Sequence, residues 1–170
     1  MLNIDNYPII FTSYFKLRKY YRHHIDYGLP FARSQDARLK TMLELSNLKP
    51  NDKVIDLGAG DGKVVIAFAK AGAIACGIEI DETLSDLARY NIKKNKLENE
   101  AFVSKGDFWD EPIGTYDVIT IYGIGNIMSR LEEKIKKEGK IGCRVVSNFF
   151  RFPSWQPVKE KESVFLYMKI

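Results

Sequence analysis

Short apolar runs and amphipathic stretches alternate along most of the chain. Runs of β-branched and other apolar residues predict strands, and they lie at residues 53–57, 73–80, 101–104 and 116–122. Stretches in which apolar positions recur at helical spacing predict helices, and they lie at residues 63–71, 83–95 and 127–137. Such alternation is typical of an α/β protein with a parallel sheet and helices on both of its faces.

The C-terminal part breaks this alternation. A strand is predicted at residues 140–148, and two more follow at residues 158–161 and 163–169. The last two strands are too close in sequence for a helix to fit between them, so they must pair as an antiparallel hairpin. The predicted sheet is therefore mixed at its end.

Residues 1–33 differ in composition from the core expected at residues 34–170, and the whole chain suits a single domain. Aromatic and basic residues interleave there, and apolar residues at helical spacing predict an amphipathic helix over about residues 9–24. These apolar residues include Ile10, Tyr14, Leu17 and Tyr21. Ser34 is expected to cap a second helix that runs to about Asn47.

Two roles are open for the helix predicted at residues 9–24. It either packs on the body of the domain, or it recruits substrate through peripheral contact with a membrane surface. The second role rests on the basic residues that flank its apolar positions, a composition found in helices that lie in the lipid interface.

Composition narrows the protein class only a little. The 170 residues carry a net charge of +4, which weakly favours acidic partners such as nucleic acid or anionic lipid.

The two cysteines, Cys76 and Cys143, lie in apolar runs and are expected to be buried free thiols. No Cys/His cluster has metal-ligand spacing, so no metal site is predicted. Neither a signal peptide nor an apolar stretch of about 20 residues is present, which predicts a cytoplasmic protein.

The stretch from Val54 to Gly62 carries the clearest chemical signal. A buried strand containing Asp56 runs directly into a turn with glycines at alternate positions, and the turn opens a helix. Glycines allow the backbone to approach a ligand closely, and the helix start presents free N–H groups. Glu79 ends the second strand, where a carboxylate can accept hydrogen bonds from both hydroxyls of a ribose. The pattern predicts a site for a cofactor that contains adenosine.

The dinucleotide cofactors fit this turn less well. Their fingerprint G-x-G-x-x-G would require a glycine where Lys63 stands. Asp56 would also repel a pyrophosphate, whereas it suits the ammonium group of a methionine moiety.

The segment from Asp56 to Gly62 resembles the first cofactor motif of class I methyltransferases, which use S-adenosylmethionine and release S-adenosylhomocysteine. Glu79 resembles the ribose-binding acid of that family, and residues 106–108 resemble its adenine-binding segment. The resemblance implies a Rossmann-like, seven-stranded sheet of order 3-2-1-4-5-7-6 with strand seven antiparallel, preceded here by extra N-terminal helices. The cofactor-binding residues that it implies are Asp56, Gly58, Ala59, Gly60, Gly62, Glu79, Ile80, Asp107, Phe108 and Tyr122.

A second resemblance concerns the substrate. Residues 144–149 and 152–157 are similar to the end of strand five and the following loop in small archaeal protein-lysine methyltransferases and in their mitochondrial relatives that modify the ATP synthase c-subunit. Tyr122, Asn148 and Trp155 are the residues expected to line the substrate channel, and Phe149 and Phe150 are further aromatic candidates. Strand four ends without the D/N-P-P-Y/F segment of enzymes that methylate planar nitrogens.

The predicted function is therefore methyl transfer to lysine side chains of a protein substrate. Three alternatives stay open: methylation of RNA, methylation of a small molecule, and a non-catalytic scaffold that still binds the cofactor. Nucleic acid is the less favoured partner, and the oligomeric state is not defined by the sequence.

Overall fold

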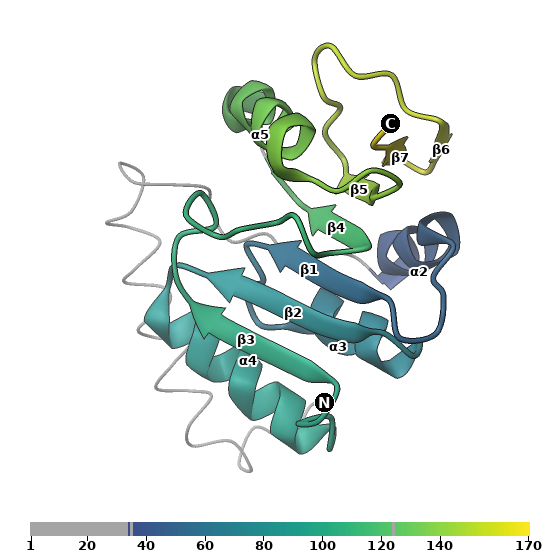
Figure 1. Ribbon diagram of the computed structural model, residues 1–170. Helices are drawn as coiled ribbons and strands as arrows, with labels where there is room; N and C mark the ends of the chain where they lie inside the picture. The colour runs from purple at the N-terminus through teal and green to yellow at the C-terminus, as the bar shows by residue number, and fades with distance from the viewer. Residues whose placement is uncertain (1–33, 35, 124) are drawn as a thin grey trace, which may run out of the picture. The chain divides into compact units, whose positions relative to one another are not determined.

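Seven strands form one twisted sheet in the part of the chain that the computed structural model describes, which comprises residues 34, 36–123 and 125–170 (Figure 1). The strands are β1 (Lys53–Leu57), β2 (Ile74–Glu79), β3 (Ala101–Lys105), β4 (Val118–Ile121), β5 (Arg144–Asn148), β6 (Lys159–Lys161) and β7 (Val164–Met168). The described helices are α2 (Asp36–Ser46), α3 (Lys63–Lys70), α4 (Glu82–Lys94) and α5 (Gly125–Glu138). The helix predicted at residues 9–24 lies outside the described residues.

The strand order is β3-β2-β1-β4-β5-β7-β6, and β7 runs antiparallel to both of its neighbours. The pairs among β1 to β5 are parallel. The predicted seven-stranded order and the antiparallel last strand are thus confirmed, and α2 supplies one of the expected extra helices before the sheet.

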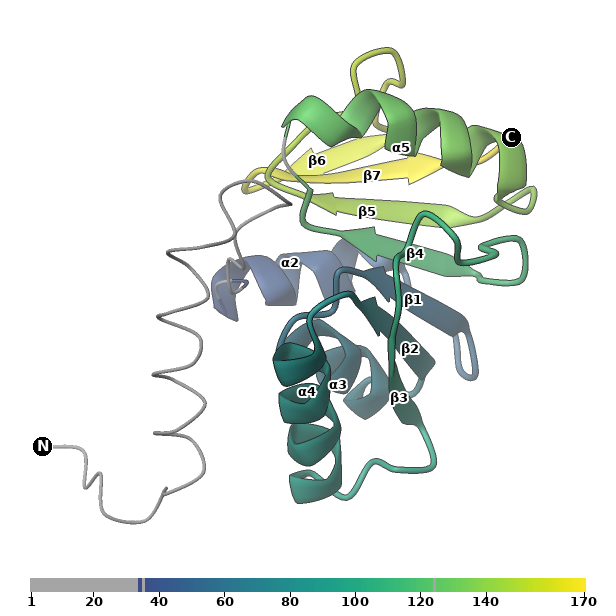
Figure 2. The same cartoon turned by 90° about the vertical axis from the view of Figure 1, so that its left-hand side faces the viewer.

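Helices lie on both faces of the sheet (Figure 2), and each face carries its own apolar core. Apolar residues of α2, α3 and α4 pack on one face, where Met42, Phe68 and Ala88 are buried. The apolar side of α5 packs on the other face, where Leu131 and Ile135 are fully buried. The central strand β4 is buried on both faces of the sheet, so its sequence is almost continuously apolar.

The ends of several elements have clear local causes. Asp81 caps α4, since its Oδ1 accepts a hydrogen bond from Leu84 N at 2.7 Å. β5 begins later than the strand predicted at residues 140–148. Gly142 has a φ of 80° and its N–H bonds the Lys169 carbonyl at 2.7 Å, so the chain turns there before the strand starts.

Arg144, the first residue of β5, fastens the C-terminal end of α2 to the sheet. Its guanidinium donates to the carbonyls of Ser46 and Asn47 at 2.9 and 2.6 Å, and to Asp52 Oδ2 at 2.7 Å. Both charged side chains are less than 10% exposed, at 9% and 8%. A cation at this place also complements the negative end of the helix.

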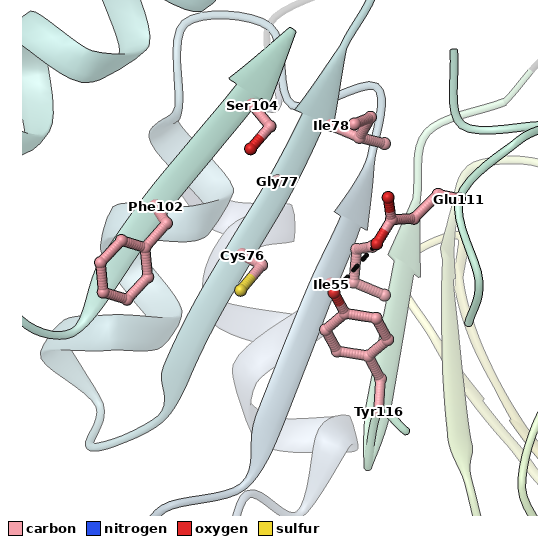
Figure 3. A pocket seen from close by; sticks show the side chains of 8 residues that line it. All are labelled: Ile55, Cys76, Gly77, Ile78, Phe102, Ser104, Glu111 and Tyr116. Atoms are coloured by element: carbon pink, nitrogen blue, oxygen red, sulfur yellow. Dashed lines mark hydrogen bonds between the residues drawn. The ribbon is translucent and has the colours of Figure 1, made fainter. Parts of the chain in front are cut away.

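The connection from β3 to β4 contains no helix, and the sheet face beneath it is only partly covered. Phe102 and Ile74 are 46% and 38% exposed there. Figure 3 shows the shallow pocket that results, on the α5 side of the sheet but away from that helix. Tyr116 donates a hydrogen bond to Glu111 Oε1 at 3.2 Å at its rim, and burial raises the pKa of the Cys76 thiol inside it. The pocket is lined by Ile55, Cys76, Gly77, Ile78, Phe102, Ser104, Glu111 and Tyr116.

Candidate cofactor and substrate site

The glycine turn after β1 leaves open space above Gly58, whereas Gly62 packs closely on Ala88 of α4. Gly58, Gly60 and Gly62 have φ values of 87°, 55° and 80°, in the left-handed region that favours glycine. The N–H groups of Gly58 and Ala59 both donate to the Ile78 carbonyl at 3.0 Å, which seats the turn against the end of β2. A Cβ placed on Gly58 would meet no atom within 4 Å. A ligand can therefore approach the backbone closely at this position.

Glu79 is held at the end of β2 with its carboxylate against the turn. The side chain is 8% exposed. Its Oε2 accepts from Gly60 N at 2.8 Å and its Oε1 accepts from Asp81 N at 2.9 Å. Each carboxylate oxygen keeps further acceptor capacity beyond one backbone bond. The carboxylate can thus receive the paired hydroxyls of a ribose.

Asp56 is a buried acid just below the turn. Burial raises the pKa of its carboxyl to about 7, and the negative charges of Glu79 and Asp61 act in the same direction. The hydroxyl of Thr120 opposes this shift, because it donates to Asp56 Oδ1 at 2.6 Å. A cationic group placed beside this carboxyl would favour its ionised form.

The loop after β3 sits beside the end of β2. Gly106 N donates to the Glu79 carbonyl at 2.9 Å, and Asp107 Oδ1 accepts from Trp109 N at 3.0 Å. The side chain of Phe108 is half-buried against the core. Ile80, directly after Glu79, is 64% exposed. These two apolar residues follow the carboxyl ends of β2 and β3, where they can meet the faces of a planar base.

Contacts that the sequence did not predict fasten this loop to α5. Lys134 Nζ donates to the Trp109 carbonyl at 3.0 Å, and the guanidinium carbon of Arg130 lies 4.0 Å from the centroid of the Trp109 ring. The two basic residues lie four positions apart, on one side of a helix. That spacing is the signal in the sequence, although their partner cannot be read from it.

Tyr122 and Asn148 lie at the carboxyl ends of neighbouring strands. Ile121 pairs with Ser147, so the residue after each falls on the next rung of the ladder. Asn148 is fully buried, and its Nδ2 donates to Ser34 Oγ at 3.2 Å. Among the described residues its Oδ1 has no hydrogen-bond partner. Of the predicted substrate residues, these two are brought together.

Trp155 lies in a different group. Its ring centroid is 5.6 Å from that of Phe152 and 5.2 Å from that of Tyr167, in the aromatic cluster beneath α5. Phe149 and Phe150 form a separate edge-to-face pair, with centroids 5.1 Å apart. Phe150 and Trp155 both pack against the core beneath α5, and the ring contacts of Trp155 are with other members of that core.

Lys63, the first residue of α3, joins the cofactor turn to the start of α2. Its Nζ donates to the Ser34 carbonyl at 2.5 Å and pairs with Asp36 at 2.7 Å. The hydroxyl oxygen of Ser34, a residue that the sequence predicts as a helix cap, accepts a hydrogen bond from Asn148 Nδ2. The sequence gives no sign of these contacts, because Ser34, Lys63 and Asn148 come together only in the folded protein.

The described residues fit an S-adenosylmethionine site. The open glycine turn accommodates close approach of a ligand, Glu79 presents a fixed carboxylate, and Asp56 is a buried acid suited to a cation. Together with the strand order, this arrangement defines a class I S-adenosylmethionine-dependent methyltransferase. A model of the ANTKMT methyltransferase domain matches residues 56–159, and the chain belongs to that family.

Relatives of known type agree. The chain is 34% identical over 131 residues to the protein-lysine N-methyltransferase of Saccharolobus islandicus, covering 76% of this chain and 81% of that enzyme. It is 31% identical over 129 residues to the ATP synthase c-subunit lysine N-methyltransferase of Rattus norvegicus, covering 76% of this chain but 59% of the rat enzyme. It therefore spans little more than half the length of that relative.

A solved structure is similar as well. An RNA methyltransferase from Salinibacter ruber, in complex with S-adenosylhomocysteine, superposes with a TM-score of 0.75 and 30% identity. The match covers 80% of this chain and 91% of that one. The family, fold and cofactor predicted from the sequence are confirmed by these comparisons.

Proposed function

We propose that this methyltransferase modifies lysine side chains of proteins, and that the acceptor enters over the ends of β4 and β5. The similarity to the Saccharolobus islandicus protein-lysine N-methyltransferase, at 34% identity over 81% of that enzyme, is the observation that carries this proposal. The proposed entry point is supported by a general rule: in open α/β sheets, ligands bind at the edge formed by the carboxyl ends of the strands.

The geometry of the turn supports the proposed cofactor-holding residues. Bound S-adenosylmethionine supplies a methyl group activated by its sulfonium charge. Glu79 would hold the ribose, and Asp56 would face the ammonium group of the methionine moiety. Ile80 and Phe108 would contact the adenine, next to Asp107. The glycine turn allows this close approach because it carries no side chain at its alternate positions.

At the acceptor end, the protein has to orient the acceptor amine, and it needs no strong base to deprotonate it. A lysine amine is nucleophilic once it has lost its proton to solvent, and the residue that faces it then has to align its lone pair. Tyr122 and Asn148 stand at this end, and the Asn148 carboxamide does not ionise. The chain therefore positions an amine that arrives neutral.

RNA is the second candidate acceptor. The Salinibacter ruber structure, with 30% identity over 91% of its length, is that of an RNA methyltransferase, and the net charge of this chain is +4. The protein acceptor is favoured because the relative from Saccharolobus islandicus has the higher identity, 34%.

Recruitment of substrate by residues 9–24 is a separate part of the proposal, and these residues lie outside the described part of the chain. Their aromatic and basic composition is what supports it. Among the helices that the structure describes, none combines the length and the apolar character needed to cross a bilayer.

Labelling of a cell lysate tests the acceptor. The protein is incubated with lysate and S-adenosylmethionine labelled in its methyl group, and the product is divided between protease and nuclease treatment. We expect label that protease releases and nuclease leaves, with methyllysine in the acid hydrolysate. A Glu79→Ala variant run in parallel separates this label from background. Label released by nuclease alone would replace the protein acceptor with RNA.

A further inference from the structure

We infer that the side-chain oxygen of Asn148 receives an N–H of the acceptor amine and so orients the nitrogen for methyl transfer. The inference rests on the proposed function, since it assigns a role at the acceptor end of the same site. The atom concerned is Asn148 Oδ1. The amide nitrogen of the same side chain has a structural role, because it binds Ser34.

The amide of Asn148 is held in place but only half used. The side chain is completely buried, and its Nδ2 donates to Ser34 Oγ at 3.2 Å. Its Oδ1 is buried without a hydrogen-bond partner in the described part of the chain. A buried carbonyl oxygen without a donor costs about 1–3 kcal/mol, so proteins seldom keep one without a reason. An N–H supplied by a ligand would remove that cost.

Strand register places this oxygen at the right end of the sheet. Asp56 on β1 pairs with Thr120 on β4, and Thr120 pairs with Val146 on β5. Asn148 lies two residues beyond Val146, hence on the same face and two positions nearer the carboxyl edge. Neighbouring strands are about 4.8 Å apart, so β5 lies roughly 10 Å from β1, the strand that carries the cofactor turn. An acceptor amine held by Asn148 would therefore lie over β4, between the two strands.

The backbone next to Asn148 fixes where β5 ends. Phe149 has a φ of 77°, which is strained for a residue with a bulky side chain, and its N–H bonds the Ser163 carbonyl at 2.7 Å. Lys63, which follows the cofactor turn, holds the carbonyl of Ser34, and the hydroxyl of Ser34 holds Asn148. Ser34 therefore links the Asn148 amide to Lys63, at the end of the cofactor turn.

A carboxamide suits the task better than a carboxylate. A neutral amine has two N–H donors and one lone pair. With one N–H directed to Asn148 Oδ1, the lone pair is free to face the methyl group. A carboxylate at the same place would stabilise the protonated ammonium, in which the lone pair is occupied.

The rival explanation is that Asn148 only secures Ser34. Two matched variants separate these roles, because Asn148→Ala removes both amide atoms whereas Ser34→Ala removes only the partner of Nδ2. We expect Asn148→Ala to lower the initial rate of lysate-protein labelling, at saturating cofactor, about tenfold more than Ser34→Ala does, on the scale of one hydrogen bond. Affinity for S-adenosylhomocysteine should be the same in both variants. Equal losses of labelling rate would overturn the inference.

The pH profile gives a second readout. In Asn148→Asp the carboxylate favours the ammonium form of the bound acceptor, so the pH of half-maximal rate should rise by about one unit or more. An unchanged profile would contradict the role of Oδ1.

The wild-type protein gives a test that does not depend on variants that fold. With S-adenosylhomocysteine bound, n-butylamine should shift the NMR signals of the Asn148 carboxamide. Butyltrimethylammonium, which has no N–H, should leave them in place. Identical responses to the two probes would defeat the inference. Labelled RNA without labelled protein would instead defeat the protein-lysine assignment, so the two failures can be told apart.

Discussion

Replacement of Glu79 by alanine tests the geometry of the cofactor site most directly. The carboxylate accepts two backbone N–H groups, from Gly60 at 2.8 Å and from Asp81 at 2.9 Å, in a place where the side chain is 8% exposed. Glu79→Ala removes both acceptors at once. It also removes the proposed partner of the ribose hydroxyls, so the variant should alter both stability and cofactor affinity.

The two effects have different sizes. Two backbone donors that lose a charged acceptor but gain access to water should lower the free energy of unfolding by about 2–3 kcal/mol in total. For a domain of this size that is a fall in melting temperature of roughly 5–10 °C. Loss of charge-assisted bonds to the ribose should cost about 1.5–3 kcal/mol in binding, or roughly a 10- to 150-fold weaker affinity.

Calorimetry with S-adenosylhomocysteine measures the second effect, and thermal unfolding without ligand measures the first. Glu82→Ala is the matched control, since Glu82 lies three residues away, is 71% exposed and pairs with Lys105 at 3.2 Å. Its loss should change stability by less than about 1 kcal/mol and leave affinity within about twofold. If folded Glu79→Ala bound the ligand as tightly as the wild type, Glu79 would not be the ribose ligand.

Two further predictions concern pH and a buried ion pair. Because burial raises the pKa of Asp56 from 3.8 to about 7, stability without ligand should fall as the pH rises from about 4 to about 7, where only the unfolded chain ionises this group. Affinity for S-adenosylmethionine should change in the opposite sense, weakening about tenfold per pH unit below pH 7, and calorimetry should find this dependence lost in Asp56→Asn. Arg144→Ala should lower the free energy of unfolding by about 3–5 kcal/mol in denaturant titrations, as it leaves Asp52 buried and unpaired. Arg151→Ala, which breaks an ion pair that is about half exposed, should cost less than about 1 kcal/mol, and equal losses would contradict the burial argument.

The sheet could be predicted from the sequence because its signals are local. Each strand reads as a short apolar run, and the close spacing of the last two dictated a hairpin. The sequence predicts that β5 starts at residue 140, which is too early, because Ile141 and Cys143 continue its apolar pattern. The turn there depends on a bond to the Lys169 carbonyl, and a contact between residues so far apart leaves no trace in a local pattern.

The cofactor half of the site was predictable for the same reason, and the acceptor half was not. Asp56, the glycine turn and Glu79 have fixed spacings that arise from one βαβ unit. The link of Asn148 to Ser34 spans most of the described chain, so it could be found only from the fold. Trp155 is a channel candidate because of its aromatic character, but that character fits a packed cluster equally well. In the structure its ring packs against Phe152 and Tyr167.

The position of Ser34 has a thermodynamic consequence. Its carbonyl is held by Lys63 of the cofactor turn, and its hydroxyl by Asn148 at the acceptor end. Ordering one of these contacts therefore removes part of the conformational freedom that the other would otherwise lose on binding. Linkage makes such coupling reciprocal: whatever factor the bound cofactor adds to the affinity for acceptor, bound acceptor adds to the affinity for cofactor. If Ser34 couples the two ends in this way, each ligand should bind less tightly once the other has left.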